Sequence, residues 1–475
     1  MSTAEERQPI LSQERSLSVN FVPEGRGGSR REDRDNGNLT LSTESRLLTS
    51  HSTTNAETLM HIIKGSLGTG ILSLPMAIKE CGIVLGPILL FLIAIISVHC
   101  MLVLVRSCHF ICSRTGQVSL DYGEVAEAAI KQSRLPRSIR DRARVGRIVV
   151  NIFLVITQFG FCCVYFLFIA DNIRDIYSQY YKDAVFDERI FVLMIAPIII
   201  LLVYIRNLDD FAPLSAIANV LSVVGLAILF EYLLAHIGEG TPLHELTMVG
   251  NFKGIAFFFG TAMYSFEGIG VVLPLENKTQ HPEDFPKVLI IGMSVVAFLY
   301  LTTGTLGYLC FGNTLKDTVT VYLPTTGLYT ATKLFFVGAI FISYGLQFYV
   351  PLSFVWPPVR NKLHDWTHSE RYDTLAEYAF RTFLVLITMT LAVAIPQLPL
   401  FISLVGAAAS SNLALIFPPI IEELTYAYRG YDTFANIRRL VKNVIICVLG
   451  LVGFGAGTYV SIQAIINAFV HQNNQ

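Results

Sequence analysis

Long apolar runs separated by short polar connections occupy most of the chain, and only its first part lacks them. In a helix that rises 1.5 Å per residue, about 20 apolar residues cross the hydrocarbon core of a bilayer. The pattern therefore predicts an all-α polytopic membrane protein with eleven transmembrane helices. The expected spans are 57–80, 82–106, 147–171, 188–206, 212–236, 254–276, 286–311, 327–357, 376–396, 398–421 and 437–468.

Residues 1–56 are rich in Ser, Arg, Glu, Asn and Gly, and they contain no apolar run of signal-peptide length. We expect a disordered cytosolic tail there, followed by a membrane domain over 57–468. Within the tail, Glu6, Ile10 and Leu11 have the spacing of an acidic dileucine signal that a sorting adaptor would read. A chance match in a disordered tail is an equally good explanation.

The amino-acid composition is that of a protein embedded in a lipid bilayer. Of the 475 residues 53% are hydrophobic and 15% are charged, and the mean hydropathy is +0.54. Soluble chains carry about 25% charged residues, so a cytosolic enzyme of ordinary type is excluded. The 35 Lys and Arg nearly balance the 36 Asp and Glu, which gives no indication of nucleic-acid binding.

Basic residues set the expected orientation, because short cytosolic loops collect Lys and Arg. Nine of them lie between Arg106 and Arg147, after the second expected span. The N-terminus is therefore expected in the cytosol. An odd number of spans then places the C-terminus on the exoplasmic side, and the sequon at Asn277 faces the cytosol.

Motifs for metal, cofactor or enzyme chemistry are not found. The eight cysteines form no C-x-x-C pair with a matching His or Cys pair, so no zinc site is expected. No P-loop, nucleophile elbow or H-E-x-x-H pattern occurs. We expect no cofactor and no catalytic residue.

Helix-breaking residues interrupt two of the spans near their middle. The first span contains KGSLGTG at 64–70 and then Pro75, and the sixth contains SFEGIG at 265–270 and then Pro274. A glycine costs about 1 kcal/mol inside a helix and a proline about 3 kcal/mol. Unwound backbone inside a bilayer is tolerated only where protein encloses it, so these stretches predict broken helices that line a cavity.

The two interrupted spans also occupy matching positions, because they begin two successive sets of five. Such a pair is a good sequence indication of a transporter binding site, and close helix packing through small residues is the alternative. Free N–H groups at the breaks suit a carboxylate and free carbonyls suit an ammonium group. We therefore expect a small neutral amino acid as substrate. The candidate substrate-binding residues are Ser66, Leu67, Gly68, Thr69, Gly70, Tyr165, Ser265, Phe266 and Gly268.

Ionisable residues inside spans are functional candidates by default. His61 precedes the first break and has the side chain that titrates near neutral pH, so we expect it to carry the coupling proton. A neutral histidine bonded between helices is the alternative. Glu267 lies inside the second break as a second protonatable group or as a structural acceptor, and Arg381 is expected at an interface or in a pair.

Several segments in order resemble the proton-coupled amino acid transporters of the amino acid/auxin permease group. The resemblance covers about residues 57–465. Its segments are HIIKGSLGTGILSLP at 61–75, TQFGFCCVY at 157–165, SFEGIG at 265–270, LPLEN at 273–277, LQFYVP at 346–351 and ISLVG at 402–406.

This resemblance implies eleven helices, ten of them in a LeuT-type inverted repeat of five plus five. It also implies proton symport of glycine, alanine and proline at the plasma membrane or at a lysosomal, late endosomal or vacuolar membrane. In that family a histidine matching His61 is the proposed proton-binding residue. The loops around Asp183 and Thr325 lack the cysteines that form a disulfide in some members.

Alternatives within and outside this class remain. The family includes proton-independent and tryptophan-preferring members, so coupling and substrate stay open. A lysosomal amino acid sensor that signals to growth control through its tail is a second reading. An ion channel is a third, and the lack of a ring-like pore motif disfavours it.

Overall fold

The computed structural model describes residues 53–181, 186–206, 211–239, 241–324, 326–367, 369–395, 397–426 and 434–472. Most of the expected tail, with the sorting signal at Glu6, Ile10 and Leu11, lies outside these residues. So do Asp183 and Thr325, which mark the two loops without the cysteines of that disulfide.

Helices make up nearly all of the described chain, and the one β-bridge in this part joins Thr53 and Thr279. In order, the helices are α2 (Asn55–Ser66), α3 (Thr69–Cys81), α4 (Leu85–Thr115), α5 (Tyr122–Gln132), α6 (Arg137–Arg140), α7 (Arg144–Tyr180), α8 (Glu188–Val203), α9 (Phe211–Ala235), η2 (Leu243–Glu245), α10 (Phe252–Ser265), α11 (Ile269–Lys278), α12 (Phe285–Phe311), η3 (Gly312–Thr314), η4 (Val319–Tyr322), α13 (Gly327–Thr367), α14 (Glu370–Ala394), α15 (Leu398–Val405), η5 (Gly406–Ser410), η6 (Asn412–Ile416), α16 (Phe417–Tyr426) and α17 (Phe434–Gln472).

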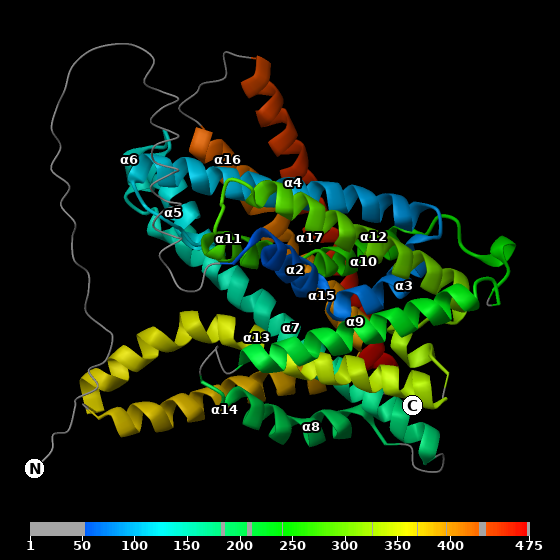
Figure 1. Ribbon diagram of the computed structural model, residues 1–475. Coiled ribbons are helices and arrows are strands. Elements are labelled where there is room, and N and C mark those ends of the chain that lie inside the picture. Colours follow the sequence, from blue (N-terminus) through cyan, green and yellow to red (C-terminus); the bar gives the residue numbers. More distant parts are fainter. Residues whose placement is uncertain are drawn as a thin grey trace, which may run out of the picture.

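The long helices form two groups that α7 connects (Figure 1). In one group α3 packs against α10 and α12, and α4 packs against α12. In the other, α8, α13 and α14 contact one another. α7 contacts α8, α13 and α14 and also α5 and α15, so its side chains lie between the groups. This arrangement places α3 and α10 in the interior, whereas α2 buries only Thr58 and Ile62.

Nine helices of the described part are long and apolar enough to cross a membrane, by length and composition alone. The chain is a multi-pass integral membrane protein. The first and fourth expected spans are helical but shorter: α2 and α3 have 12 and 13 residues, and α8 has 16. The count of eleven spans therefore stays a prediction.

Several helices continue beyond the apolar runs that predicted them. α4 ends at Thr115, past the expected end at 106, and α13 runs to Thr367, past the expected end at 357. Backbone hydrogen bonds do not depend on side-chain polarity, so a helix can leave the apolar layer without ending. α13 also contains Pro351, Pro357 and Pro358 without ending there.

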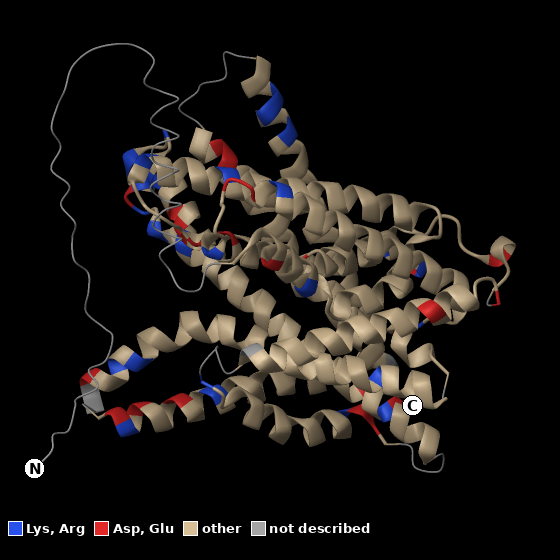
Figure 2. Ribbon diagram, in the orientation of Figure 1, with Lys and Arg blue, Asp and Glu red and all other residues tan. Residues whose placement is uncertain are grey.

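Charged residues gather at the ends of the helices, and the middle of the bundle is almost free of them (Figure 2). One end carries the basic residues of α6 and of the first turn of α7. The side chains that face outward along the middle include Phe91, Ile95, Phe298 and Val452, all of them exposed. An apolar belt between two charged ends is the surface that a bilayer requires.

Candidate functional site

Both interrupted spans are broken in the structure at the glycine-containing stretches, while Pro75 and Pro274 lie inside α3 and α11. α2 ends at Ser66 and α3 begins at Thr69, while α10 ends at Ser265 and α11 begins at Ile269. The residues that cap α3 and α11 are glycines, so no side chain caps these two helix starts. Each second half-helix therefore presents backbone N–H groups and the positive end of its dipole at the break.

The two breaks lie against each other, and Tyr300 of α12 connects them. Its hydroxyl is within hydrogen-bond distance of the carbonyl oxygens of Ser66 and Ser265, at 2.8 Å from the latter. These carbonyls end the first half of each broken helix. A second contact joins the Thr69 hydroxyl to the Tyr264 hydroxyl at 2.8 Å. The Tyr300 hydroxyl thus binds backbone carbonyls that the breaks leave without helical partners, and the Thr69–Tyr264 contact adds a side-chain link between the two broken helices.

A glycine allows the two broken helices to touch. A Cβ added to Gly70 would lie 2.8 Å from the Ser265 Cα, closer than real Cβ atoms approach other atoms. Gly68 has more room, since its Cβ would lie 3.6 Å from the Tyr165 hydroxyl. The short distance between α3 and α10 therefore depends on Gly70, a residue with no side chain.

Aromatic side chains fill the space beside the breaks. Phe161 packs on Tyr264 with ring centroids 4.6 Å apart, and Phe266 packs on Tyr300 at 5.0 Å. Tyr165 of α7 hydrogen-bonds to the side chain of Gln347 in α13. All four ring-bearing residues of the two pairs are buried. This wall shields the polar groups at the breaks from the lipid.

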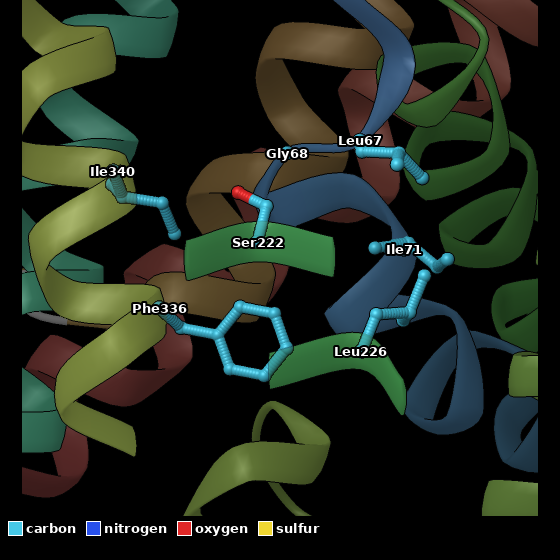
Figure 3. Close-up of a pocket in the computed structure, with 7 residues that line it drawn as sticks. All are labelled: Leu67, Gly68, Ile71, Ser222, Leu226, Phe336 and Ile340. Atoms are coloured by element: carbon cyan, nitrogen blue, oxygen red, sulfur yellow. The ribbon is translucent and has the colours of Figure 1, made fainter. Parts of the chain in front are cut away.

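A pocket opens at the first break, between α2–α3, α9 and α13 (Figure 3). Its cavity volume is about 10 Å³, which is room for about one water molecule, so the pocket is nearly closed in this conformation. Figure 3 shows the Ser222 hydroxyl directed toward the backbone at Gly68. The lining residues are Leu67, Gly68, Ile71, Ser222, Leu226, Phe336 and Ile340.

The predicted substrate residues fall into three sets. Leu67 and Gly68 line the pocket, with Tyr165 beside Gly68. A second set makes the contacts between the two breaks and does not line the pocket: Ser66, Thr69, Gly70, Ser265 and Phe266. Gly268 belongs to neither set, since its Cβ position faces Met101.

The residues Tyr300, Ser222 and Phe336 were not predicted for this site. A tyrosine near the middle of an apolar span is a usable signal, because a buried hydroxyl needs a hydrogen-bond partner. Ser222 and Phe336 carry no such signal. Helices of many proteins contain a serine or a phenylalanine, and only the packing of α9 and α13 brings these two to the break.

The two proton-coupling candidates lie apart from the pocket lining. His61 is exposed on α2, and its charged neighbours are Glu57, Lys64 and Lys278. Glu267 lies in the second break beside Ser410 of η5, and its Oε2 atom is buried without a hydrogen-bond partner among the described residues. η5 and η6 are π-helical, a form that often marks functional positions.

The described residues contain neither a metal-binding cluster nor a disulfide. Among the residues that the structure describes, no group of three or more His, Cys, Asp or Glu could hold a metal ion. All eight cysteines fall in the described ranges, and each is a free thiol.

A membrane bundle in which two broken helices meet beside a pocket is the arrangement found at the binding sites of many transporters. The family comparison makes this specific, because a sequence model described as transmembrane amino acid transporter protein matches residues 51–463. The chain belongs to this family, and it is therefore a transporter and not an enzyme.

Curated relatives extend over almost the whole chain. The Drosophila melanogaster protein named proton-coupled amino acid transporter-like protein pathetic is 35% identical over 428 residues, covering 89% of this chain and 88% of the relative. The Caenorhabditis elegans protein named probable amino acid transporter skat-1 is 28% identical over 430 residues, covering 88% and 91%. A solved structure, the inward-facing conformation of Mhp1, has 12% identity and a TM-score of 0.44, covering 89% of this chain and 92% of that one.

Proposed function

We propose that the protein is a proton-coupled symporter of small neutral amino acids, such as glycine, alanine and proline, and that it works by alternating access. The observation that supports this best is the joining of both broken helices by Tyr300 next to the pocket at Gly68. Movement of one half-helix would change the hydrogen bonds at both breaks. The name of the Drosophila relative supports proton coupling.

The substrate is proposed to bind at the first break. The uncapped start of α3 at Gly68 and Thr69 would receive its carboxylate, and the small pocket would limit its side chain. No Arg or Asp lines this pocket, so a charged substrate side chain would lack a partner. The proton is the proposed coupling ion, with His61 as its first carrier and Glu267 as a second site.

We further propose eleven membrane-spanning segments, with α2–α3 and α10–α11 opening two inverted repeats of five. The N-terminus would be cytosolic and the C-terminus exoplasmic. The membrane would be the plasma membrane or a lysosomal or late endosomal membrane, and an adaptor that reads Glu6, Ile10 and Leu11 would direct the protein there.

Uptake into vesicles that contain the purified protein tests this proposal. Labelled glycine, alanine, proline and tryptophan are compared, with and without an inward proton gradient. We expect the three small substrates to enter faster with the gradient. In His61→Ala this stimulation is lost while insertion is retained, and in His281→Ala, an exposed histidine of a loop, it is kept.

Three results would each revise a different part of the proposal. Gradient-independent uptake in the unchanged protein would indicate a proton-independent carrier. Loss of signalling output, without loss of flux, on deletion of residues 1–56 would indicate a sensor role carried by the tail. Unchanged proton stimulation in His61→Ala would overturn only the proposed role of His61, and the proposal of proton-coupled transport would stand.

A further inference from the structure

A buried group of carboxylates lies at the end of α7 opposite α6, away from the residues discussed so far. Asp171 of α7 is 1% exposed, and Glu188, the first residue of α8, is 8% exposed. Arg174 is 3.2 Å from Asp171 Oδ1 and 3.0 Å from Glu188 Oε2. One guanidinium therefore serves two carboxylates that come from different helices.

The carboxyl groups of Asp171 and Glu188 also approach each other within hydrogen-bond contact. Among the described residues, Glu188 Oε1 is buried without a hydrogen-bond donor, and Asp171 Oδ1 has Arg174 as its ion-pair partner. Two ionised carboxylates offer each other only acceptors, and they repel in a medium of low dielectric constant. A single proton between them would provide the missing donor and remove one negative charge.

Four elements supply the other charges around this pair, and acidic side chains outnumber basic ones. Figure 2 shows the acidic residues where the chain enters α8. The surrounding charged groups are Arg174 and Asp175 of α7, Asp187 before α8, Asp317 after η3 and Lys333 of α13.

Pairing these groups leaves an excess of negative charge. Lys333 is fully buried and forms an ion pair with Asp175, so these two charges cancel. Of the described cations, Arg174 contacts both Asp171 and Glu188, and Arg189 of α8 follows Glu188 directly in the sequence. Burying unpaired charge is costly, and an excess of this kind is normally relieved by proton uptake.

Asp317 lies in the segment between η3 and η4, outside the membrane-spanning helices. Burial raises the pKa of its carboxyl to about 6, although the Thr318 backbone N–H, at 2.7 Å, and Arg174 both lower it. This group thus titrates in a mildly acidic range, close to the two carboxyls of the helices.

We propose that Asp171, Glu188 and Asp317 form a proton-binding site that is separate from His61 and Glu267. Its position at the exoplasmic mouth of the pocket rests on the orientation proposed above. The bound proton joins α7, α8 and the segment 315–324 into one closed unit. Its loss leaves carboxylates that repel and loosen this end of the molecule.

Two helices connect this site to the pocket. Asp171 follows Tyr165 by six residues along α7, or about 9 Å, and Lys333 precedes Phe336 by three residues along α13, or about 4.5 Å. A change in the packing of α7 and α13 at the carboxylates would therefore reach the pocket wall within two helical turns. The pH at this face would then regulate access of substrate to the pocket.

The pH dependence of unfolding tests the site without any need for transport. The purified full-length protein is melted at a series of pH values from about 4 to about 8. Because the folded state holds a proton that the unfolded chain releases, stability falls as pH rises through the titration of the site. We expect Tm to fall over this range in the unchanged protein.

Variants that remove one of the titrating carboxyl groups should make Tm depend less on pH. Glu188→Gln keeps an oxygen for Arg174 and supplies a permanent N–H donor toward Asp171, and Asp171→Asn does the converse. We expect the fall in Tm to shrink by half or more in each. Glu245→Gln, an exposed carboxylate in η2, should keep the fall of the unchanged protein. Curves for Glu188→Gln and Asp171→Asn that coincide with that of Glu245→Gln would overturn the proposal.

Uptake against outer pH at a fixed proton gradient provides the second readout. Glu188→Gln should retain at alkaline outer pH the KM for glycine that the unchanged protein has only at acidic pH. A structural ion-pair network would predict a lower rate with an unchanged pH profile, and that result would also overturn the proposal. If no variant transports any amino acid but the Tm curves differ as expected, the proposed function fails and the proton site stands.

Discussion

Single residues determine how the two broken helices meet. Gly70 permits α3 to touch α10 at Ser265, and Tyr300 lies within hydrogen-bond distance of the carbonyl groups that both breaks expose. The glycines predicted the breaks, because a glycine is unfavourable in the interior of a helix. Tyr300 was missed, because its role depends on a neighbouring helix.

Gly70→Ala tests this contact. The new Cβ would lie 2.8 Å from the Ser265 Cα, so α3 and α10 must separate, and overpacking of this kind costs about 1–3 kcal/mol. We expect a lower Tm and at least a tenfold loss of uptake per molecule in the membrane. Gly65→Ala is the matched control, since no atom lies within 4 Å of its Cβ position and alanine favours a helix. Equal uptake in the two variants would show that the close approach is dispensable.

At the scale of whole helices, the sequence predicted that a charged residue is paired without identifying its partners. Arg381 of α14 was expected in a pair or at an interface, and the pair is confirmed. It is 4% exposed and donates hydrogen bonds to Glu377 and to the carbonyl oxygens of Val203 and Ile205. Arg381 thereby caps the end of α8 and fixes this short helix to α14.

Arg381→Met should therefore destabilise the protein. It leaves the end of α8 without its cap and leaves Glu377, 7% exposed, with Arg206 as its remaining partner at 2.6 Å. Breaking a buried ion pair costs about 3–5 kcal/mol, and we expect the lower end because Arg206 stays. Thermal unfolding measures the loss. Arg371→Met, an exposed position on the same helix, should change Tm little, and an equal Tm in both variants would contradict the role of Arg381.

The charge distribution of the whole molecule gives its expected orientation. The basic residues of α6 and of the start of α7 lie at one end of the bundle (Figure 2). Cytosolic loops retain Lys and Arg, so this end is expected in the cytosol. The Asp171 and Glu188 site, at the other end of α7, would then face the exoplasmic side.

Epitope tags at the two termini test this orientation. In sealed cells or organelles, a tag after residue 475 should be reached by antibody from the exoplasmic side, and a tag before residue 1 only after permeabilisation. Asn277 should carry no glycan. Labelling of both tags from the same side would require an even number of spans and would contradict the count of eleven.

Structural features that depend on neighbouring residues in the chain could be predicted from the sequence, and features that depend on other helices could not. Apolar runs of membrane length predicted the helices, and small, helix-breaking residues at 64–70 and 265–270 predicted where two of them end. The end of α13 at Thr367 was not predicted, because a helix leaving the bilayer keeps its backbone hydrogen bonds. The role of the candidate site residues stays a prediction.

By itself, the sequence determined that this protein lies in a membrane, that its spans are helices and that two of them are broken. These properties follow because backbone groups inside a bilayer need hydrogen-bond partners within the protein. Each property can be recognised from about 20 consecutive residues. Only the tertiary structure decided that Tyr300 joins both breaks, that the pocket opens toward α9 and α13, and that Asp171 meets Glu188. Such contacts join residues of different helices, and no local pattern records which faces of two helices will pack together.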